Sequence, residues 1–138
     1  IHPFALGTEN KPVSMGNDSV RKTGYLGTGQ NFVNDSGDAV AVEFRADMRR
    51  GSELFGSLPR LDFIKCDIEG YEWIVMREMQ PLLERFRPTV LIETGGANRQ
   101  AIIGLFTAMG YAGFTLDGGR EVPLGPATPE KDIIFRPR

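Results

Sequence analysis

The sequence has very little of the side-chain chemistry on which several protein classes depend. It contains one cysteine, Cys66, and one histidine, His2. A single cysteine forms no internal disulfide, and no cysteine and histidine cluster is available to hold a structural zinc ion. Sites that pair histidine with a serine or cysteine nucleophile would all need His2, so we discount them. The scarcity of cysteine favours a reducing compartment.

An excess of charge of one sign and long apolar runs are also lacking. The sequence has 16 Lys and Arg residues against 18 Asp and Glu residues, a formal net charge of −2 at pH 7. This balance leaves no electrostatic footprint for nucleic acid or an anionic membrane surface. The apolar runs fall well short of the ~20 residues that cross a bilayer, and the beginning does not resemble a signal peptide. We therefore expect neither nucleic-acid binding nor membrane insertion.

The length of 138 residues and the hydrophobic content of 41% suit one compact domain. A complete eight-fold barrel of about 250 residues does not fit in this length. No repeat appears, but the composition changes near residue 60. We predict a single domain over residues 1–138, with a strand-and-loop region at 1–60 and an α/β half at 61–138.

Turn-forming residues dominate the first region. Gly, Asn, Ser, Thr and Asp recur through residues 1–38, which predicts short strands, hairpins and exposed loops. Residues 39–44 alternate valine with alanine and predict a strand, and residues 47–55 predict a short helix before Pro59. The glycine-rich run at 24–29 does not join a strand to a helix, so we interpret it as a flexible hairpin rather than a phosphate cradle.

Apolar strand-length runs alternate with helical patterns in the second half. We predict strands at 61–68, 89–93, 113–116 and 132–135, and helices at 71–79, from Pro81 onward, and from Asn98 to Gly110. This order indicates an α/β fold. We expect a mostly parallel sheet with an antiparallel edge strand and with helices on its faces.

Acidic side chains follow both of the first two strands in this half. Asp67 and Glu69 come after one strand, and Glu93 ends the next. Ligands of open α/β sheets bind beyond the carboxyl ends of the strands, so neighbouring strands would place the three carboxylates around one mouth. Such carboxylates can act as a general base, bind a divalent cation or hold the hydroxyl groups of a polar substrate.

Each of these residues also has a structural interpretation. For Glu72 the structural interpretation is the favoured one, since a carboxylate at a helix N-terminus interacts with the helix dipole. For Asp67, Glu69 and Glu93 the two interpretations stay open, because structural networks also gather carboxylates. Lys65 lies two residues before Asp67, where it can keep that carboxylate ionised or simply extend its ammonium group into water. We interpret Cys66 as a small core residue.

Two segments resemble the signature of FkbM-type methyltransferases. They are Asp-Phe-Ile-Lys-Cys-Asp-Ile-Glu-Gly-Tyr-Glu at 62–72 and Arg-Pro-Thr-Val-Leu-Ile-Glu at 87–93. Phe-Ala-Leu-Gly at 4–7 resembles the end of the third strand of that family, and Met-Gly-Tyr at 109–111 resembles its late Gly-Tyr element. The resemblance spans most of the chain, and the 62–72 segment is its most specific part.

The resemblance implies S-adenosylmethionine-dependent methyl transfer to a hydroxyl of a sugar, lipid or secondary metabolite. It implies part of a class I, Rossmann-like methyltransferase sheet and S-adenosylmethionine as cofactor, with no metal expected. Carried over by position, Asp67 and Glu69 are the catalytic candidates, one of them as the base that removes the hydroxyl proton. Lys65, Glu72 and Glu93 are the candidates for binding the acceptor. A bacterial cytoplasmic setting is implied by the family and the single cysteine.

The sequence departs from the family at its beginning. The glycine-rich motif after the first strand and the acidic residue after the second are absent, and the first residue is Ile1. We expect these cofactor-binding motifs upstream, which makes this chain the C-terminal portion of a methyltransferase domain. The family strand order 3-2-1-4-5-7-6 then predicts a gap beside the fourth strand and an unpaired strand edge. The isolated chain is expected to bind the cofactor weakly or not at all and to be inactive.

Two other functions are compatible with the carboxylates. A hydrolase with a carboxylate pair would use Asp67 and Glu69 as acid and nucleophile or base, although a barrel scaffold for it exceeds this length. A non-catalytic α/β binding domain would contact a sugar or a partner protein through its acidic mouth. For a methyltransferase, we expect acceptor specificity to depend on loops such as residues 10–38.

Overall fold

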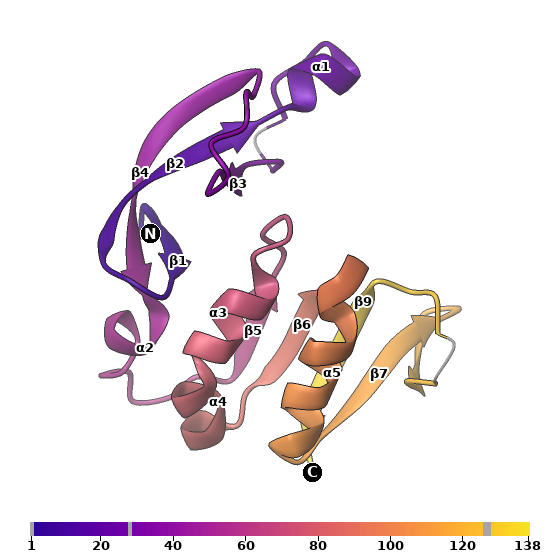
Figure 1. Cartoon of the computed structure of the whole chain (residues 1–138). Helices are drawn as coiled ribbons and strands as arrows, with labels where there is room; N and C mark the ends of the chain where they lie inside the picture. The colour runs from indigo at the N-terminus through magenta and orange to yellow at the C-terminus, as the bar shows by residue number, and fades with distance from the viewer. Residues whose placement is uncertain (1, 28, 126–127) are drawn as a thin grey trace.

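Two β-sheets and five α-helices make up the described part of the protein, a computed structural model that describes residues 2–27, 29–125 and 128–138. Figure 1 shows the two sheets one above the other, with helices in front of the lower sheet. The elements are β1 (Phe4–Gly7), β2 (Lys11–Asn17), α1 (Ser19–Thr23), β3 (Phe32–Val33), β4 (Val42–Arg50), α2 (Gly51–Leu54), β5 (Phe63–Cys66), α3 (Glu72–Glu78), α4 (Gln80–Phe86), β6 (Thr89–Glu93), the 3₁₀ helix η1 (Gly96–Asn98), α5 (Arg99–Ala108), β7 (Tyr111–Asp117), β8 (Arg120–Pro123) and β9 (Asp132–Pro137).

The first sheet has the strand order β1-β4-β2-β3. β4 pairs parallel with β1 and antiparallel with β2. Strands β2 and β4 form the long curved ribbon in the upper left of Figure 1. Close approach shapes this sheet at Gly16, because a Cβ atom there would lie 2.8 Å from the ring of Phe32 on the neighbouring strand. The short strand β3 can therefore lie flat against β2.

The expected helix at 47–55 is wrong over most of its length. β4 continues as a strand to Arg50, and only Gly51–Leu54 is helical. Met48 is buried at 1% exposure, while its strand neighbours Asp47 and Arg49 point away and form an ion pair at 3.6 Å. Because β4 has a hydrogen-bonded strand on each side, tertiary pairing overrides the local helical preference.

The second sheet has the order β5-β6-β9-β7-β8, whose first four strands follow the order 4-5-7-6 implied by the resemblance. The prediction of a mostly parallel sheet is wrong: among its four described strand pairs only β5 with β6 is parallel. The antiparallel strand β9 lies inside the sheet, between β6 and β7, and the hairpin strand β8 was not predicted. Strand insertion of this kind leaves no periodic signal in the sequence.

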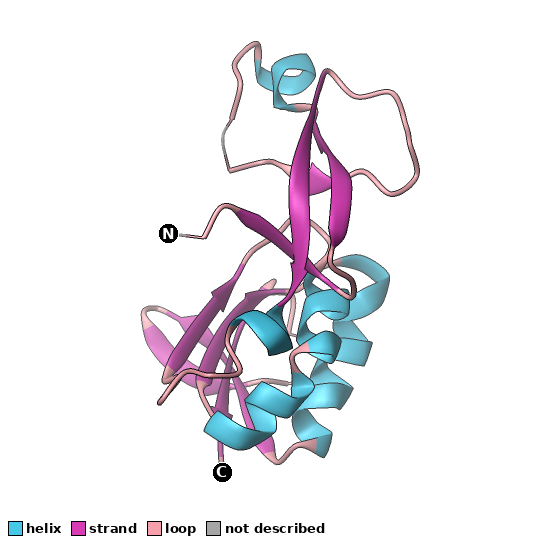
Figure 2. Cartoon of the chain, turned by 90° about the vertical axis from the view of Figure 1, so that its left-hand side faces the viewer, coloured by secondary structure: helices cyan, strands magenta, loops and turns pink. Residues whose placement is uncertain are grey.

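Helices α3, α4 and α5 cover one face of the second sheet, as the side view in Figure 2 shows. Phe106 of α5 stacks on Phe135 of β9 with ring centroids 4.1 Å apart, and the edge of Tyr111 completes the aromatic cluster. The core consists of Cys66, Val75, Met76, Met79, Leu82, Leu83, Val90, Ile92, Ile102, Phe106, Tyr111, Ile133 and Phe135. The interpretation of Cys66 as a core residue is confirmed, and burial raises the pKa of its thiol to about 12.

The other expectations for the second half agree with the structure. The helix after β5 stops at Glu78 and a new helix begins at Gln80, with Pro81 in its first turn, where its missing N–H has no consequence. α5 ends before Gly110, which has the positive φ of 77° that a helix-terminating glycine provides. No helix in the described ranges is long and apolar enough to cross a membrane.

Arg87, in the Arg-Pro pair of the resemblance, ties together the ends of two helices. Its guanidinium donates hydrogen bonds to the carbonyl oxygens of Met109 and, at 3.2 Å, of Gly110, where α5 ends. It also lies 4.8 Å from the ring centroid of Tyr111. A cation at a helix C-terminus interacts favourably with the helix dipole and satisfies its last carbonyl groups. The Arg-Pro pair therefore has a structural role at the amino end of β6.

We expect Arg87→Ala to lower the free energy of unfolding by about 2 kcal/mol, since it removes charge-assisted hydrogen bonds and leaves carbonyl groups without their donor. Urea unfolding followed by circular dichroism measures this change. Arg45→Ala, at an exposed arginine on β4, is the matched control and should change stability by less than about 0.5 kcal/mol. Equal effects of the two substitutions would contradict a structural role for Arg87.

Candidate functional site

The parallel pairing of β5 with β6 brings the predicted carboxylates together. Cys66 lies opposite Ile92 in this pair, so the next residues, Asp67 and Glu93, lie side by side at the carboxyl ends of the two strands. Each of the two carboxyl groups affects the pKa of the other, and the effect lowers the pKa of Asp67 and raises that of Glu93. The prediction that these strands are neighbours, with their acidic ends at one mouth, is confirmed.

The paired carboxylates differ in proton affinity because their surroundings differ. Lys65 Nζ lies 2.7 Å from Asp67 Oδ2, and this hydrogen bond, more than any other contact, lowers the pKa of Asp67. Burial, followed by the hydrogen bond and charge of Asp67, raises the pKa of Glu93, although Lys131 Nζ lies 3.8 Å from Glu93 Oε1. The expected influence of Lys65 on Asp67 is confirmed, and Glu93 is the member of the pair that holds a proton more readily.

A small pocket of about 190 Å³ lies at this edge of the sheet, and we call it the acidic pocket. Its wall comes from the loop after β5 with the first residue of α3, the end of β6, the turn and 3₁₀ helix η1 that follow it, and the segment before β9. The lining residues are Glu69, Gly70, Glu72, Glu93, Gly95, Asn98 and Lys131. The sequence reasoning found the acidic members but missed Asn98 and Lys131, because only the insertion of β9 beside β6 brings Lys131 to this place.

The loop between β5 and α3 has an unusual backbone that Glu72 holds in place. Glu69 has φ of 55°, in the left-handed region that residues with a side chain rarely adopt, and Gly70 has φ of 100°. Glu72, at 7% exposure, accepts hydrogen bonds on Oε1 from the N–H groups of Ile68 at 3.0 Å and Gly70 at 3.2 Å. Strained backbone of this kind is concentrated at functional sites. Glu72 therefore positions Glu69 at the pocket.

Arg99 secures the opposite wall of the acidic pocket. Its guanidinium donates hydrogen bonds to Thr94 Oγ1 at 2.8 Å and to the carbonyl oxygens of Glu130 and Thr128 at 2.7 and 2.9 Å. Thr94 in turn donates from Oγ1 to the carbonyl oxygen of Lys131 at 2.8 Å. These bonds fix the segment before β9 against the end of β6, which places the Lys131 ammonium group near Glu93.

The outer edge of β5 has no strand partner among the described residues, as the resemblance predicted. β1 and β5 belong to different sheets, and a groove of about 350 Å³, which we call the edge groove, lies along β5. Phe63 is 55% exposed here. The edge groove is lined by Leu6, Phe55, Leu58, Leu61, Phe63, Ile64, Lys65, Cys66, Ile68, Val75, Met76 and Met79. An open, apolar strand edge is a template for pairing with another strand.

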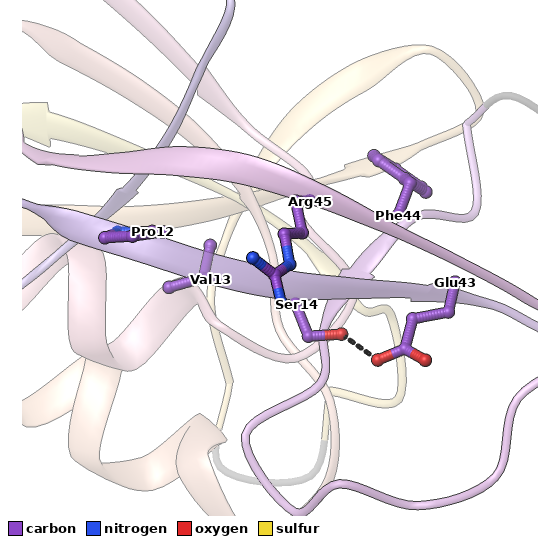
Figure 3. A pocket seen from close by; sticks show the side chains of 6 residues that line it. All are labelled: Pro12, Val13, Ser14, Glu43, Phe44 and Arg45. Carbon is purple, nitrogen blue, oxygen red and sulfur yellow. Dashed lines mark hydrogen bonds between the residues drawn. The ribbon is translucent and has the colours of Figure 1, made fainter.

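A separate hollow of about 590 Å³ lies on the β2–β4 ribbon, with Pro12, Val13, Ser14, Glu43, Phe44 and Arg45 around it (Figure 3). Ser14 Oγ donates a hydrogen bond of 2.5 Å to Glu43 Oε1, so these polar groups satisfy each other. All six residues belong to one two-stranded ribbon, away from the strand ends that carry the acidic pocket. We assign no function to this hollow.

The described residues offer few groups that would hold a cofactor. No group of three His, Cys, Asp or Glu side chains within them is placed to hold a metal ion. The carboxylates can accept hydrogen bonds from hydroxyl groups, but the turn after β5 has only Gly70, and the turn after β6 has only Gly95 and Gly96. Neither turn has the Gly-x-Gly-x-x-Gly spacing of a dinucleotide cradle. The glycine-rich run at 24–29 follows helix α1, and its residue 28 lies outside the described residues. These residues do not by themselves fit S-adenosylmethionine.

Comparison with known proteins identifies one family. The model of the methyltransferase FkbM domain family matches residues 13–112, which is more than half of the chain. This range extends from β2 to the start of β7 and includes both strands and all four carboxylates discussed above. No curated protein and no solved structure gave a match.

We expect Glu72→Ala to lower the free energy of unfolding by about 1 to 2 kcal/mol, because two partly buried hydrogen bonds from N–H groups lose their acceptor. In Glu72→Gln the amide oxygen can still accept both bonds, so the loss should stay below about 1 kcal/mol. Urea unfolding gives the stability, and amide hydrogen exchange at Ile68 and Gly70 reports the loop directly. Unchanged protection of these two amides in Glu72→Ala would show that the loop holds itself.

We expect Lys65→Met to raise the pKa of Asp67 toward its ordinary value, since the substitution removes the cation that favours the ionised carboxylate. Carboxyl carbon NMR during a pH titration measures the pKa of Asp67 and of Glu93 separately. Lys11→Met, which removes a lysine that pairs with Glu9 at 3.5 Å, is the control and should leave both values unchanged. A constant Asp67 pKa in Lys65→Met would refute the assignment of this ion pair.

Proposed function

We propose, since the chain belongs to the family of methyltransferase FkbM domains, that it contributes the acceptor side of an S-adenosylmethionine-dependent O-methyltransferase. The proposed acceptor is a hydroxyl of a sugar, lipid or secondary metabolite. The observation that carries this proposal is the family match over residues 13–112 together with the acidic pocket, whose lining residues except Lys131 lie in that range. Carboxylates at the carboxyl ends of neighbouring strands suit the binding and deprotonation of a hydroxyl group.

The residues of the acidic pocket, together with Asp67 and Lys65 beside it, divide the work between proton transfer and orientation. The Asp67 and Glu93 pair accepts the hydroxyl proton, with Glu93 as its more basic member because its pKa is raised. Glu69, which the left-handed backbone turns toward the pocket, accepts a hydrogen bond from the acceptor and orients it. Lys65 and Lys131 keep the carboxylates from repelling each other. Glu72 acts indirectly, because the hydrogen bonds it accepts from Ile68 and Gly70 hold the loop backbone that carries Glu69.

The cofactor's principal contacts lie on elements other than those described. The open edge of β5 supports this part of the proposal, and it also supports the expectation that the 138 residues alone are inactive. The alternative is a non-catalytic α/β domain that binds a sugar or a partner protein through the acidic pocket. The two functions differ in whether a cofactor binds at all.

A calorimetric titration of S-adenosylmethionine separates these functions. We expect heat of binding when the titrated protein includes the sequence upstream of Ile1, and little or none with the 138-residue chain. The physical reason is that carboxylates alone supply no backbone cradle for the cofactor. Binding by neither protein would favour the non-catalytic domain, and tight binding by the 138-residue chain would contradict the proposed division of the site.

In the longer protein we expect Asp67→Asn and Glu69→Gln each to reduce methyl transfer by about 100-fold or more. The first substitution removes a member of the pair that accepts the proton, and the second removes the carboxylate that orients the hydroxyl group. The transfer of radiolabelled methyl groups to a hydroxyl acceptor measures the rate, and thermal unfolding measures stability. Asp117→Asn, at an exposed carboxylate on β7, is the control and should retain full activity. A large loss of stability with an unchanged rate would make Asp67 and Glu69 structural.

A further inference from the structure

A second groove, which we call the bridging groove, lies between the two sheets. Its volume is about 290 Å³. Each lining residue is half-buried and none is charged, so the groove presents apolar surface that remains open to solvent. The lining residues are Phe4, Ala5, Leu6, Met15, Asn31, Phe32, Val33, Ile68 and Tyr71. Small-molecule sites are typically concave and mostly apolar, and they start near 300 Å³.

Both sheets contribute to the bridging groove. β1, β2 and β3 form one wall, and Ile68 and Tyr71 from the loop after β5 form the other. Tyr71 Oη donates a hydrogen bond of 2.9 Å to Asp35 Oδ2, which joins this loop to the segment after β3. Burial is the largest cause that raises the pKa of Tyr71 to about 12, so its hydroxyl stays a neutral donor at physiological pH. This hydrogen bond therefore links the two walls of the groove.

The bridging groove and the acidic pocket share one loop as a wall. Ile68 and Tyr71 line the groove, whereas Glu69, Gly70 and Glu72 of the same loop line the pocket. The hydrogen bonds that Glu72 Oε1 accepts from Ile68 and Gly70 fix the backbone between the two sites. A ligand that extends over this loop would therefore touch apolar side chains on one side and carboxylates on the other.

We propose that the bridging groove binds the apolar part of an amphipathic acceptor, whose hydroxyl-bearing part reaches over the loop into the acidic pocket. This inference rests on the proposed function and narrows its substrate class. A wholly polar sugar would leave the apolar wall exposed to water and would gain nothing from it. The lack of charged lining residues disfavours an anionic head group in the groove. The fitting acceptor is a hydroxylated head that carries an alkyl chain or an apolar ring.

A matched pair of probes tests this inference without any catalytic step. Octyl β-D-glucoside, kept below its micelle concentration, and methyl β-D-glucoside share a head group and differ only in the apolar chain. Titrations of the ¹⁵N-labelled 138-residue chain are followed by NMR. We expect octyl glucoside to bind at least about tenfold more tightly, since each buried methylene adds favourable transfer free energy. Its shifts should centre on Leu6, Val33, Ile68 and Tyr71.

Two groove variants and one control make the result specific. Met15→Lys places a charge in the apolar wall and should weaken octyl glucoside binding about tenfold. Val33→Thr keeps the side-chain shape and should weaken it about threefold, which provides a test if Met15→Lys disturbs the spectrum of the folded protein. Leu116→Lys, at a 53% exposed leucine outside the groove, should leave the affinity unchanged.

Several results would overturn the inference. One is equal affinity for the two glucosides, and another is a set of chemical shift changes centred on the edge groove beside Phe63. A third is self-association of the chain, measured by sedimentation, that octyl glucoside does not reverse. Failure of the proposed function is distinguishable from these results. Octyl glucoside that binds in the groove but is never methylated by the longer protein would refute the methyltransferase and leave the groove assignment intact. Methylation of both glucosides with equal KM would support the methyltransferase and refute the groove assignment.

Discussion

The parallel pairing of β5 with β6 is the constraint on which the site depends. This one pair aligns Cys66 with Ile92 and so places Asp67 beside Glu93 at a common edge. Two lysines lie beside these positions: Lys65 of β5 contacts Asp67, and Lys131, which precedes the strand that pairs with β6, lies near Glu93. A register shift of one residue would turn the two carboxylates to opposite faces of the sheet.

Three side chains, two of them in the family signature, hold the backbone around this arrangement. Glu72 holds the left-handed backbone at Glu69, and Arg87 joins the ends of two helices beneath β6. Arg99 fixes the segment that carries Lys131. None of these three side chains needs to touch a substrate, yet each determines where a candidate substrate-binding group lies. A signature residue is thus as readily explained by a carbonyl or N–H group that it satisfies as by chemistry.

The two sheets meet along a boundary that is apolar and incompletely covered. The edge groove beside β5 and the bridging groove between the sheets both lie there, and Ile68 lines both. Open apolar surface next to an acidic pocket is costly unless something covers it. The proposed function assigns the covering of the β5 edge to further strands, and the proposed amphipathic acceptor covers the bridging groove.

The sequence by itself determined the strands at Phe63–Cys66 and Thr89–Glu93, the helix restart at Pro81, the stop at Gly110 and the acidic ends of both strands. These features depend on local pattern, because side-chain periodicity and the backbone limits of proline and glycine act over a few residues. The family resemblance already implied the place of β9 between β6 and β7, and only the tertiary structure decided that β4 continues to Arg50 and that Lys131 reaches Glu93. Strand pairing joins residues far apart in the chain, and its hydrogen bonds come from the backbone, which is the same at every position.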